Sequence, residues 1–210
     1  MSPVDGIFYI IVLIMSVVIH EFAHGYTAYL LGDNTARLSG RLTLNPIKHL
    51  DLLGSVILPL LLIFMRAGFV IGWAKPVPYN PNNLRDIKKG TFLVAVAGIL
   101  ANLLIAIVFG LLMRFAPLFV SASIALPFYK ITSIIVMLNL VLVLFNLVPI
   151  PPLDGSKILF SYLPVKYKYI EDFLEQWGMV LLLGFILFLW VKVAPLVYIT
   201  FHFITGLSLM

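Results

Sequence analysis

A series of long apolar runs, separated by short polar segments, limits the fold of this chain more than any other feature. The longest runs cover residues 4–31, 50–73, 91–115 and 131–148, and a last one begins near residue 178. About 20 consecutive apolar residues are enough for a helix to cross the hydrocarbon core of a bilayer. Of the 210 residues, 62% are apolar and only 11% are charged. This composition excludes a cytosolic enzyme, a disordered chain and a nucleic-acid reader that is merely basic.

We therefore predict an all-α polytopic membrane protein, a bundle of about four to six transmembrane helices. Residues 1–210 are expected to form one domain, with core helices over residues 4–31, 91–115 and 131–155 and C-terminal helices over residues 178–207. The region 33–90 contains more glycine, proline and polar residues. Here we expect a re-entrant segment with a short β-hairpin between the first core helix and the next.

The basic residues predict the topology. Most of the 14 Lys and Arg residues lie in three polar segments, residues 33–49, 74–90 and 156–177. Positive loops stay on the cytoplasmic side, which places the N-terminus outside. The first two segments are both cytoplasmic only if residues 50–73 enter the membrane and return. The alternative is one ordinary crossing with an imperfect charge bias.

The first apolar run contains the motif His20-Glu21-Phe22-Ala23-His24. On a helix, residues i and i+4 share a face, so the two imidazoles can bind one Zn²⁺ while Glu21 acts as general base on a water. The alternative is three buried polar residues packed among helices. An ionisable group inside a membrane span costs roughly 2.5–3.5 kcal/mol, so three of them without a nearby Lys or Arg favour the metal.

Two histidines leave a zinc site short of one protein ligand. Asp154 is the favoured candidate, because it follows a proline-rich break at the end of an apolar run and precedes Gly155. Its alternative role is to cap a helix that starts near Ser156. The other acidic residues lie in charged loops or on an amphipathic face: Asp33, Asp51, Asp86, Glu171, Asp172 and Glu175.

The HEFAH motif and the segment NLVPIPPLDG (residues 146–155) together resemble the site-2 proteases, which are intramembrane zinc metalloproteases. The similarity is greatest to short bacterial and archaeal members without PDZ or CBS domains. The stretch AGILAN (Ala97–Asn102) resembles the family's Gly-Pro-x-x-Asn segment, although Ile99 stands where proline is common.

This resemblance implies a zinc metalloendopeptidase that hydrolyses peptide bonds of transmembrane substrate helices. It implies His20, His24 and Asp154 as ligands of one Zn²⁺, Glu21 as catalytic base, and Asn146 near the scissile carbonyl, where its amide can donate to the oxyanion. Asn146 has an alternative role in a helix–helix hydrogen bond.

The expected partners are a transmembrane protein or peptide substrate and the lipid bilayer, with no nucleic acid. We expect an integral protein of a prokaryotic cell membrane with its active site in the cytoplasmic half. The rival hypotheses are a zinc-binding membrane protein without proteolytic activity, such as a transporter, and a pseudoprotease. The intact Glu21 argues against the pseudoprotease.

Overall fold

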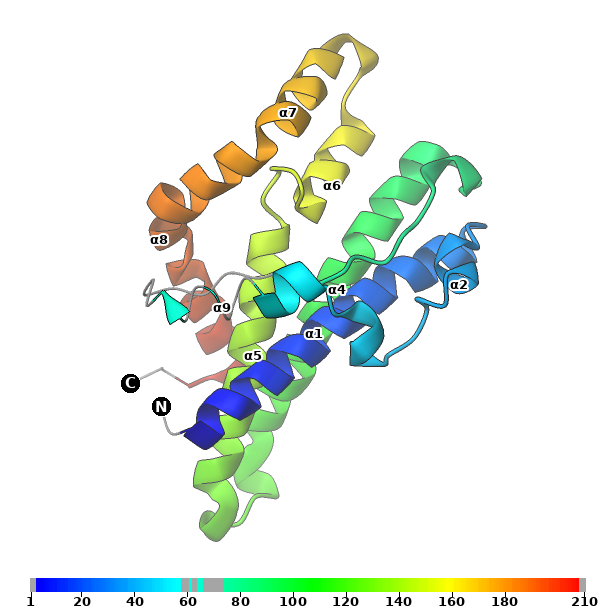
Figure 1. Cartoon of the computed structure of the whole chain (residues 1–210). Helices are drawn as coiled ribbons and strands as arrows, with labels where there is room; N and C mark the ends of the chain where they lie inside the picture. Colours follow the sequence, from blue (N-terminus) through cyan, green and yellow to red (C-terminus); the bar gives the residue numbers. More distant parts are fainter. Residues whose placement is uncertain (1–2, 58–60, 62–63, 66–73, 208–210) are drawn as a thin grey trace.

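The computed structural model describes residues 3–57, 61, 64–65 and 74–207 of the chain. Its regular elements in these residues are helical (Figure 1). The α-helices are α1 (Pro3–Leu30), α2 (Thr35–Leu38), α4 (Ile87–Phe115), α5 (Ala122–Asn146), α6 (Asp154–Tyr162), α7 (Lys168–Gly184), α8 (Trp190–Val193) and α9 (Pro195–Thr205). Short 3₁₀ or π-helical elements are η1 (Pro46–His49), η2 (Leu52–Ile57), η3 (Pro81–Asn83), η4 (Ala116–Leu118), η5 (Val165–Tyr167) and η6 (Phe185–Leu189).

Four helical stretches in the described part of the chain are long and apolar enough to cross a membrane: Gly6–Leu30, Ile87–Leu118, Ala122–Asn146 and Val165–Val193. The prediction of a helical, polytopic membrane protein is confirmed to this extent. α9 is also apolar, but its 11 residues are too few to span a bilayer on their own.

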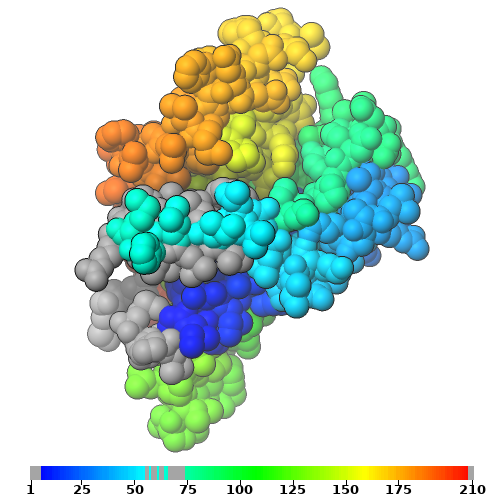
Figure 2. Space-filling view, in the orientation of Figure 1, coloured from blue at the N-terminus to red at the C-terminus, as the bar shows by residue number. Residues whose placement is uncertain are grey.

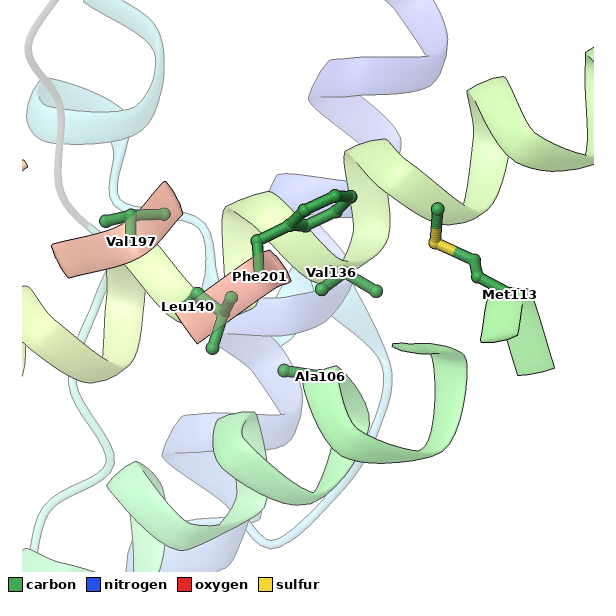
Figure 3. Packing of buried hydrophobic residues seen from close by; sticks show 6 residues of the cluster. All are labelled: Ala106, Met113, Val136, Leu140, Val197 and Phe201. Atoms are coloured by element: carbon green, nitrogen blue, oxygen red, sulfur yellow. The ribbon is translucent and has the colours of Figure 1, made fainter. Parts of the chain in front are cut away.

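Helix α4 is the centre of the bundle and runs antiparallel to both α1 and α5 (Figure 1). Its face toward α5 and α9 contributes to a buried apolar cluster that Figure 3 shows converging from three helices: Ala106, Met113, Val136, Leu140, Val197 and Phe201. A Cβ atom at Gly110 would lie only 2.5 Å from Ile204 Cγ2. A small residue at this point therefore lets α9 approach α4 closely, as is common between membrane helices.

Two helix boundaries differ from the expected core helices. α5 begins at Ala122, not near residue 131, and contains Pro127. Proline near the start of a membrane helix frees few backbone acceptors, so it does not end the helix there. α5 then ends at Asn146, and the expected continuation to residue 155 is replaced by a turn after which Asp154 opens α6.

The predicted short β-hairpin in residues 33–90 was wrong, because the described residues of this region contain no strand. They form α2, η1, η2, η3 and an irregular segment, residues 74–80. Pro76 and Pro78 lie at alternate positions of that segment, so neither can donate a backbone hydrogen bond to a neighbouring strand. Asn45 and Asn80 instead cap short 3₁₀ turns, accepting from Ile47 N–H and Asn82 N–H.

The prediction that residues 50–73 re-enter the membrane falls largely outside the described residues. The two flanks of this stretch are described, however, and they meet: Lys75 N–H donates to the His49 carbonyl at 2.8 Å. The chain therefore comes back at residue 75 to the level at which it left at residue 49. In the space-filling view, η1 and η2 (cyan) lie between α1 (blue) and the α6–α7 hairpin (yellow to orange) (Figure 2).

Candidate metal centre

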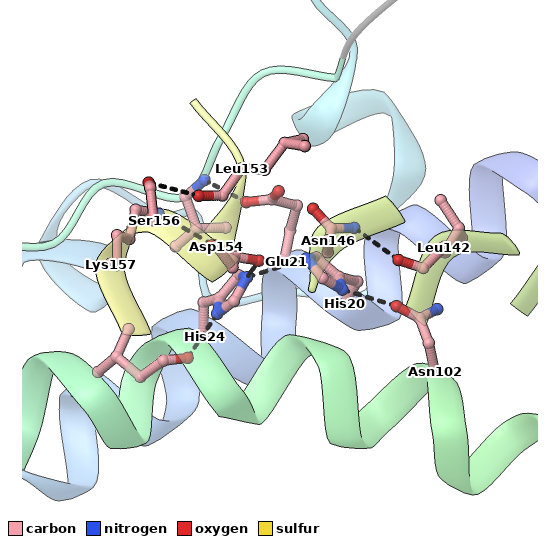
Figure 4. Close-up of polar contacts among 12 residues, drawn as sticks. His20, Glu21, His24, Asn102, Leu142, Asn146, Leu153, Asp154, Ser156 and Lys157 are labelled. Atoms are coloured by element: carbon pink, nitrogen blue, oxygen red, sulfur yellow. Dashed lines mark hydrogen bonds and ion pairs between the residues drawn. The ribbon is translucent and has the colours of Figure 1, made fainter. Parts of the chain in front are cut away.

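Three side-chain donor atoms from two helices meet at one buried point of the bundle (Figure 4). His20 and His24 lie one turn apart on α1, and their Nε2 atoms are 3.0 Å from each other. Asp154 Oδ2, from the first turn of α6, lies 3.0 Å from His20 Nε2 and 2.9 Å from His24 Nε2. All three side chains are buried. Among the described residues, this is the group of histidine and acidic side chains with the spacing to hold a metal ion.

The second nitrogen of each imidazole is also held. His20 Nδ1 is 2.6 Å from Asn102 Oδ1, and His24 Nδ1 is 2.6 Å from the backbone carbonyl of Val94, both on α4. Oxygen acceptors at Nδ1 favour a proton on that nitrogen, which leaves the Nε2 lone pair free. Metal-ligating histidines are usually oriented in this way.

Asp154 presents only one oxygen to the histidines. Its other oxygen, Oδ1, accepts from the Lys157 ammonium group at 3.0 Å, one helical turn along α6. Gly155 is required beside it, because a side chain there would collide with the backbone carbonyls of Leu147 and Val148. The start of α6 therefore packs closely against the backbone at the end of α5. This packing places the Asp154 carboxylate beside the two histidines of α1.

Helix α4 leaves space for the two rings because it carries no side chain at Gly98. A Cβ atom at this position would lie 2.5 Å from the His24 ring and 2.7 Å from the His20 ring. Gly98 belongs to the AGILAN segment quoted from the sequence, which also supplies Asn102. In this segment, Gly98 lets α4 approach the two imidazole rings closely, and Asn102 forms the hydrogen bond to His20.

Glu21 lies between the two histidines in sequence, and the extended segment 74–80 holds its carboxylate. Val77 N–H donates to Glu21 Oε2 at 2.8 Å. The close approach of this segment to α1 depends on Gly25, since a Cβ atom there would lie 2.6 Å from Val77 Cγ1. The segment is fixed at its far end by Asp33, whose Oδ2 accepts from Asn80 N–H at 2.7 Å.

The remaining predicted residues are not members of the three-residue cluster. Asn146, at the last position of α5, donates from Nδ2 to the Leu142 carbonyl of its own helix at 3.0 Å. Among the alternative acidic ligands, Asp51 accepts from the N–H groups of Leu53 and Gly54, and Asp86 caps α4 through Lys89 N–H. Glu171, Asp172 and Glu175 lie on α7. None of these acidic residues belongs to the three-residue cluster.

The donor set fits zinc. Two imidazole nitrogens and one carboxylate oxygen are the three-ligand type found in catalytic zinc sites, which keep a fourth position for water or substrate. Asn102 and the Val94 carbonyl orient the two imidazoles, and Lys157 holds the outer carboxylate oxygen. Glu21 follows His20 in the sequence, the position that carries the general base in the HExxH motif of metalloproteases.

Five residues near the cluster had no role in the sequence analysis. Val77, Gly98 and Lys157 contact the site residues directly, and Asn139 hydrogen-bonds to both Asn102 and Ser16. Asn102 was quoted there only as part of a motif. Asn102 and Asn139 had a usable signal, because both are amides inside otherwise apolar spans, where polar side chains need partners. Val77 contributes its backbone N–H, a group that nearly every residue type has, so the sequence carries no signal for this contact.

Comparisons with known proteins agree with this chemistry. A family model described as Peptidase family M50 matches residues 116–189, a range that includes Asn146 and Asp154. The chain is 40% identical over 190 residues to "Putative zinc metalloprotease YwhC" of Bacillus subtilis, covering 89% of this chain and 80% of that protein. It is 31% identical over 180 residues to "Putative zinc metalloprotease Rip2" of Mycolicibacterium smegmatis, covering 82% and 64%.

A more distant similarity extends to an archaeon. "Zinc metalloprotease MJ0392" of Methanocaldococcus jannaschii is 27% identical over 162 residues, covering 77% of this chain and 36% of that protein. The chain thus spans most of YwhC but less than two thirds of the other two relatives. No solved structure matches it significantly.

Proposed function

Because the chain belongs to peptidase family M50, the site-2 proteases, we propose that it is an intramembrane zinc metalloendopeptidase that hydrolyses peptide bonds within transmembrane segments. The observation that carries this proposal is the convergence of His20, His24 and Asp154 inside a bundle of apolar helices, with Glu21 beside them. These three residues would hold one zinc ion.

A zinc ion bound there supplies a Lewis acid that polarises the scissile carbonyl and makes a water acidic enough to attack near neutral pH. Glu21 accepts the proton of the attacking water and later delivers it to the leaving amine. Its Oε2 is held by Val77 N–H, so the carboxylate keeps its orientation while the other oxygen receives the proton.

Asn146 acts on the substrate carbonyl in this proposal. Its Nδ2 gives one hydrogen to the Leu142 carbonyl, and a primary amide has a second hydrogen to donate. That donor would stabilise the negative charge that develops on the carbonyl oxygen, a contribution that is often worth a few kcal/mol in hydrolases, about 3–4.

The orientation in the membrane follows from the basic loops. His20 and His24 lie in the second half of α1, which leads to the basic segments 33–49 and 74–90. If these segments are cytoplasmic, the active site lies in the cytoplasmic half of the membrane and the N-terminus lies outside. The hydrogen bond between Lys75 and His49 supports a common side for both segments. Relatives from bacteria and an archaeon support a prokaryotic cell membrane.

The experiment that tests this function separates metal binding from proteolysis. Glu21→Gln removes the base and leaves the three ligands unchanged, so we expect full zinc content and loss of cleavage. Membrane proteomics of cells that express the wild type or Glu21→Gln would identify fragments present only with the wild type. Glu175→Gln, on an exposed part of α7, is the matched control and should cleave normally. Wild-type fragments in Glu21→Gln would contradict the proposal and leave a zinc-binding protein without this mechanism.

A further inference from the structure

Asn102, which orients the His20 ring, is itself hydrogen-bonded to two further polar side chains, Ser16 and Asn139. Ser16, Asn102 and Asn139 come from α1, α4 and α5, and their exposed fractions are 3%, 0% and 0%. Buried amides inside membrane spans are costly unless they are hydrogen-bonded. The hydrogen bonds of these three side chains therefore indicate their role in the structure.

The bonds form one connected chain that ends at the histidine. Asn102 Nδ2 lies 3.3 Å from the Ser16 carbonyl and 2.8 Å from Asn139 Oδ1. Asn139 Nδ2 lies 2.9 Å from Ser16 Oγ and 2.8 Å from the Ile135 carbonyl. At the other end, Asn102 Oδ1 lies 2.6 Å from His20 Nδ1.

The donor directions follow from the backbone carbonyls, which can only accept. The NH₂ group of Asn139 must face the Ile135 carbonyl, so its Oδ1 faces Asn102 and accepts. The NH₂ group of Asn102 must then face Asn139 and the Ser16 carbonyl, which turns Asn102 Oδ1 toward His20. A carbonyl oxygen at 2.6 Å requires the proton on His20 Nδ1. The free lone pair is consequently on Nε2.

His24 reaches the same state by a simpler route, because its Nδ1 faces the backbone carbonyl of Val94 directly. A backbone carbonyl cannot reverse its polarity, whereas a side-chain amide can rotate by half a turn. A reversed Asn102 would present NH₂ to His20 Nδ1 and favour the tautomer with the proton on Nε2, which cannot bind a metal. The tautomer of His20 therefore depends on residues that hold the Asn102 amide in one orientation, whereas the tautomer of His24 does not.

We propose that Asn139, with Ser16, is a positioning residue that locks the Asn102 amide in one orientation and so keeps His20 in the tautomer whose Nε2 can bind metal. Of the two hydrogen bonds that Asn102 Nδ2 donates, the one to the Ser16 carbonyl is longer than the one to Asn139 Oδ1. The bond to Asn139 therefore contributes most to the orientation of the amide. The inference rests on the proposed function only in taking His20 as a zinc ligand.

The test measures the tautomer and the metal affinity separately. The ¹⁵N shifts of the imidazole nitrogens report which nitrogen carries the proton in zinc-free, histidine-labelled protein well above the ordinary histidine pKa of about 6.5. His20→Gln assigns the His20 signals. Zinc affinity is measured by competition with a chromophoric chelator.

In the wild type we expect a protonated Nδ1 at His20. In Asn139→Leu we expect a second population with the proton on Nε2 and a loss of zinc affinity of about tenfold, as is typical when a residue that orients a metal ligand is changed. Thr132→Val is the matched control, because Thr132 is buried on the same helix but bonds only to α5 carbonyls. It should leave tautomer and affinity unchanged.

Wild-type tautomer and wild-type zinc affinity in Asn139→Leu would overturn the inference. If that variant does not fold, Ser16→Ala carries the test, since it removes only the hydroxyl that accepts from Asn139. Its effect should have the same direction and be smaller, and wild-type values in it would likewise overturn the role. If the wild-type protein binds no zinc, the proposed function fails, while the tautomer measurement still decides this inference.

Discussion

Asp33, which follows α1, and Asp154, in the first turn of α6, are both buried carboxylates, yet their surroundings differ in kind. Asp33 is met by neutral donors: the backbone N–H groups of Thr35 and Asn80, the Thr35 hydroxyl and the Asn83 amide. Asp154 instead faces two imidazole nitrogens, with Lys157 on its outer oxygen. Both oxygens of Asp33 accept hydrogen bonds from donors of the chain, whereas Oδ2 of Asp154 lies within 3.0 Å of two imidazole nitrogens, where a bound cation would bridge the three side chains. This contrast separates a structural clamp, Asp33, from the metal ligand proposed at Asp154.

The largest expected effect is the loss of metal from Asp154→Ala. Changing a residue that only holds a metal ligand in place costs about 10–100-fold in affinity, so removal of a ligand should cost at least about 100-fold and abolish cleavage. Zinc content after purification and chelator competition measure this, with Asp33→Ala as the matched aspartate control. Stoichiometric zinc at wild-type affinity in Asp154→Ala would assign the third ligand to another residue.

A moderate effect on folding, without loss of metal, is expected from Asp33→Asn. The amide oxygen can still accept, but the NH₂ group faces donors, so buried N–H groups lose their partner at a cost of about 1–3 kcal/mol. Thermal unfolding in detergent should show a lower midpoint, and zinc stoichiometry should stay at the wild-type value. Loss of zinc in this variant, with an unchanged midpoint, would reverse the roles assigned to the two carboxylates.

The smallest effect is a pH dependence that belongs to Asp33. Burial favours its neutral form, but the hydrogen bonds from Thr35, Asn83 and Asn80 outweigh burial and hold the pKa of Asp33 below its ordinary value. Its contribution to stability is therefore complete above the unfolded pKa of about 3.9 and is lost as the pH falls through the lower folded pKa. The difference in unfolding midpoint between wild type and Asp33→Asn should be constant from pH 7 to about 5 and shrink below about pH 4. If the difference in midpoint disappears already near pH 6, the pH dependence belongs to a group other than Asp33.

The sequence was informative where the signal is local. The His20–His24 spacing predicts two imidazoles on one helical face, and the apolar runs predict the spanning helices. The β-hairpin was wrong because glycine, proline and polar residues indicate turns without specifying what lies between them. The expected helix began at residue 131, whereas α5 begins at Ala122 and includes Pro127, because a membrane helix tolerates proline near its start.

Sequence reasoning paired Asp154 with the two distant histidines, but it did not predict the long-range contacts of the residues that support them. Asn102 and Asn139 are each visible as an isolated amide in an apolar run, but nothing in either run indicates that they meet each other and His20. Asp86 was dismissed as a loop charge, whereas it caps α4 and moves the start of that helix to Ile87. The role of Gly98 follows only from the crossing of α4 over α1.

The hydrogen bond from Val77 to Glu21 has a consequence for how this site is inherited. The donor is a main-chain amide, so nineteen of the twenty amino acids can supply it and no mutation among them deletes it. Evolution can therefore vary the side chain at residue 77 within the space over Gly25 and still retain the contact. Alignments score side chains, and this interaction would leave one trace in them: an absence of proline at a position that has proline on both sides.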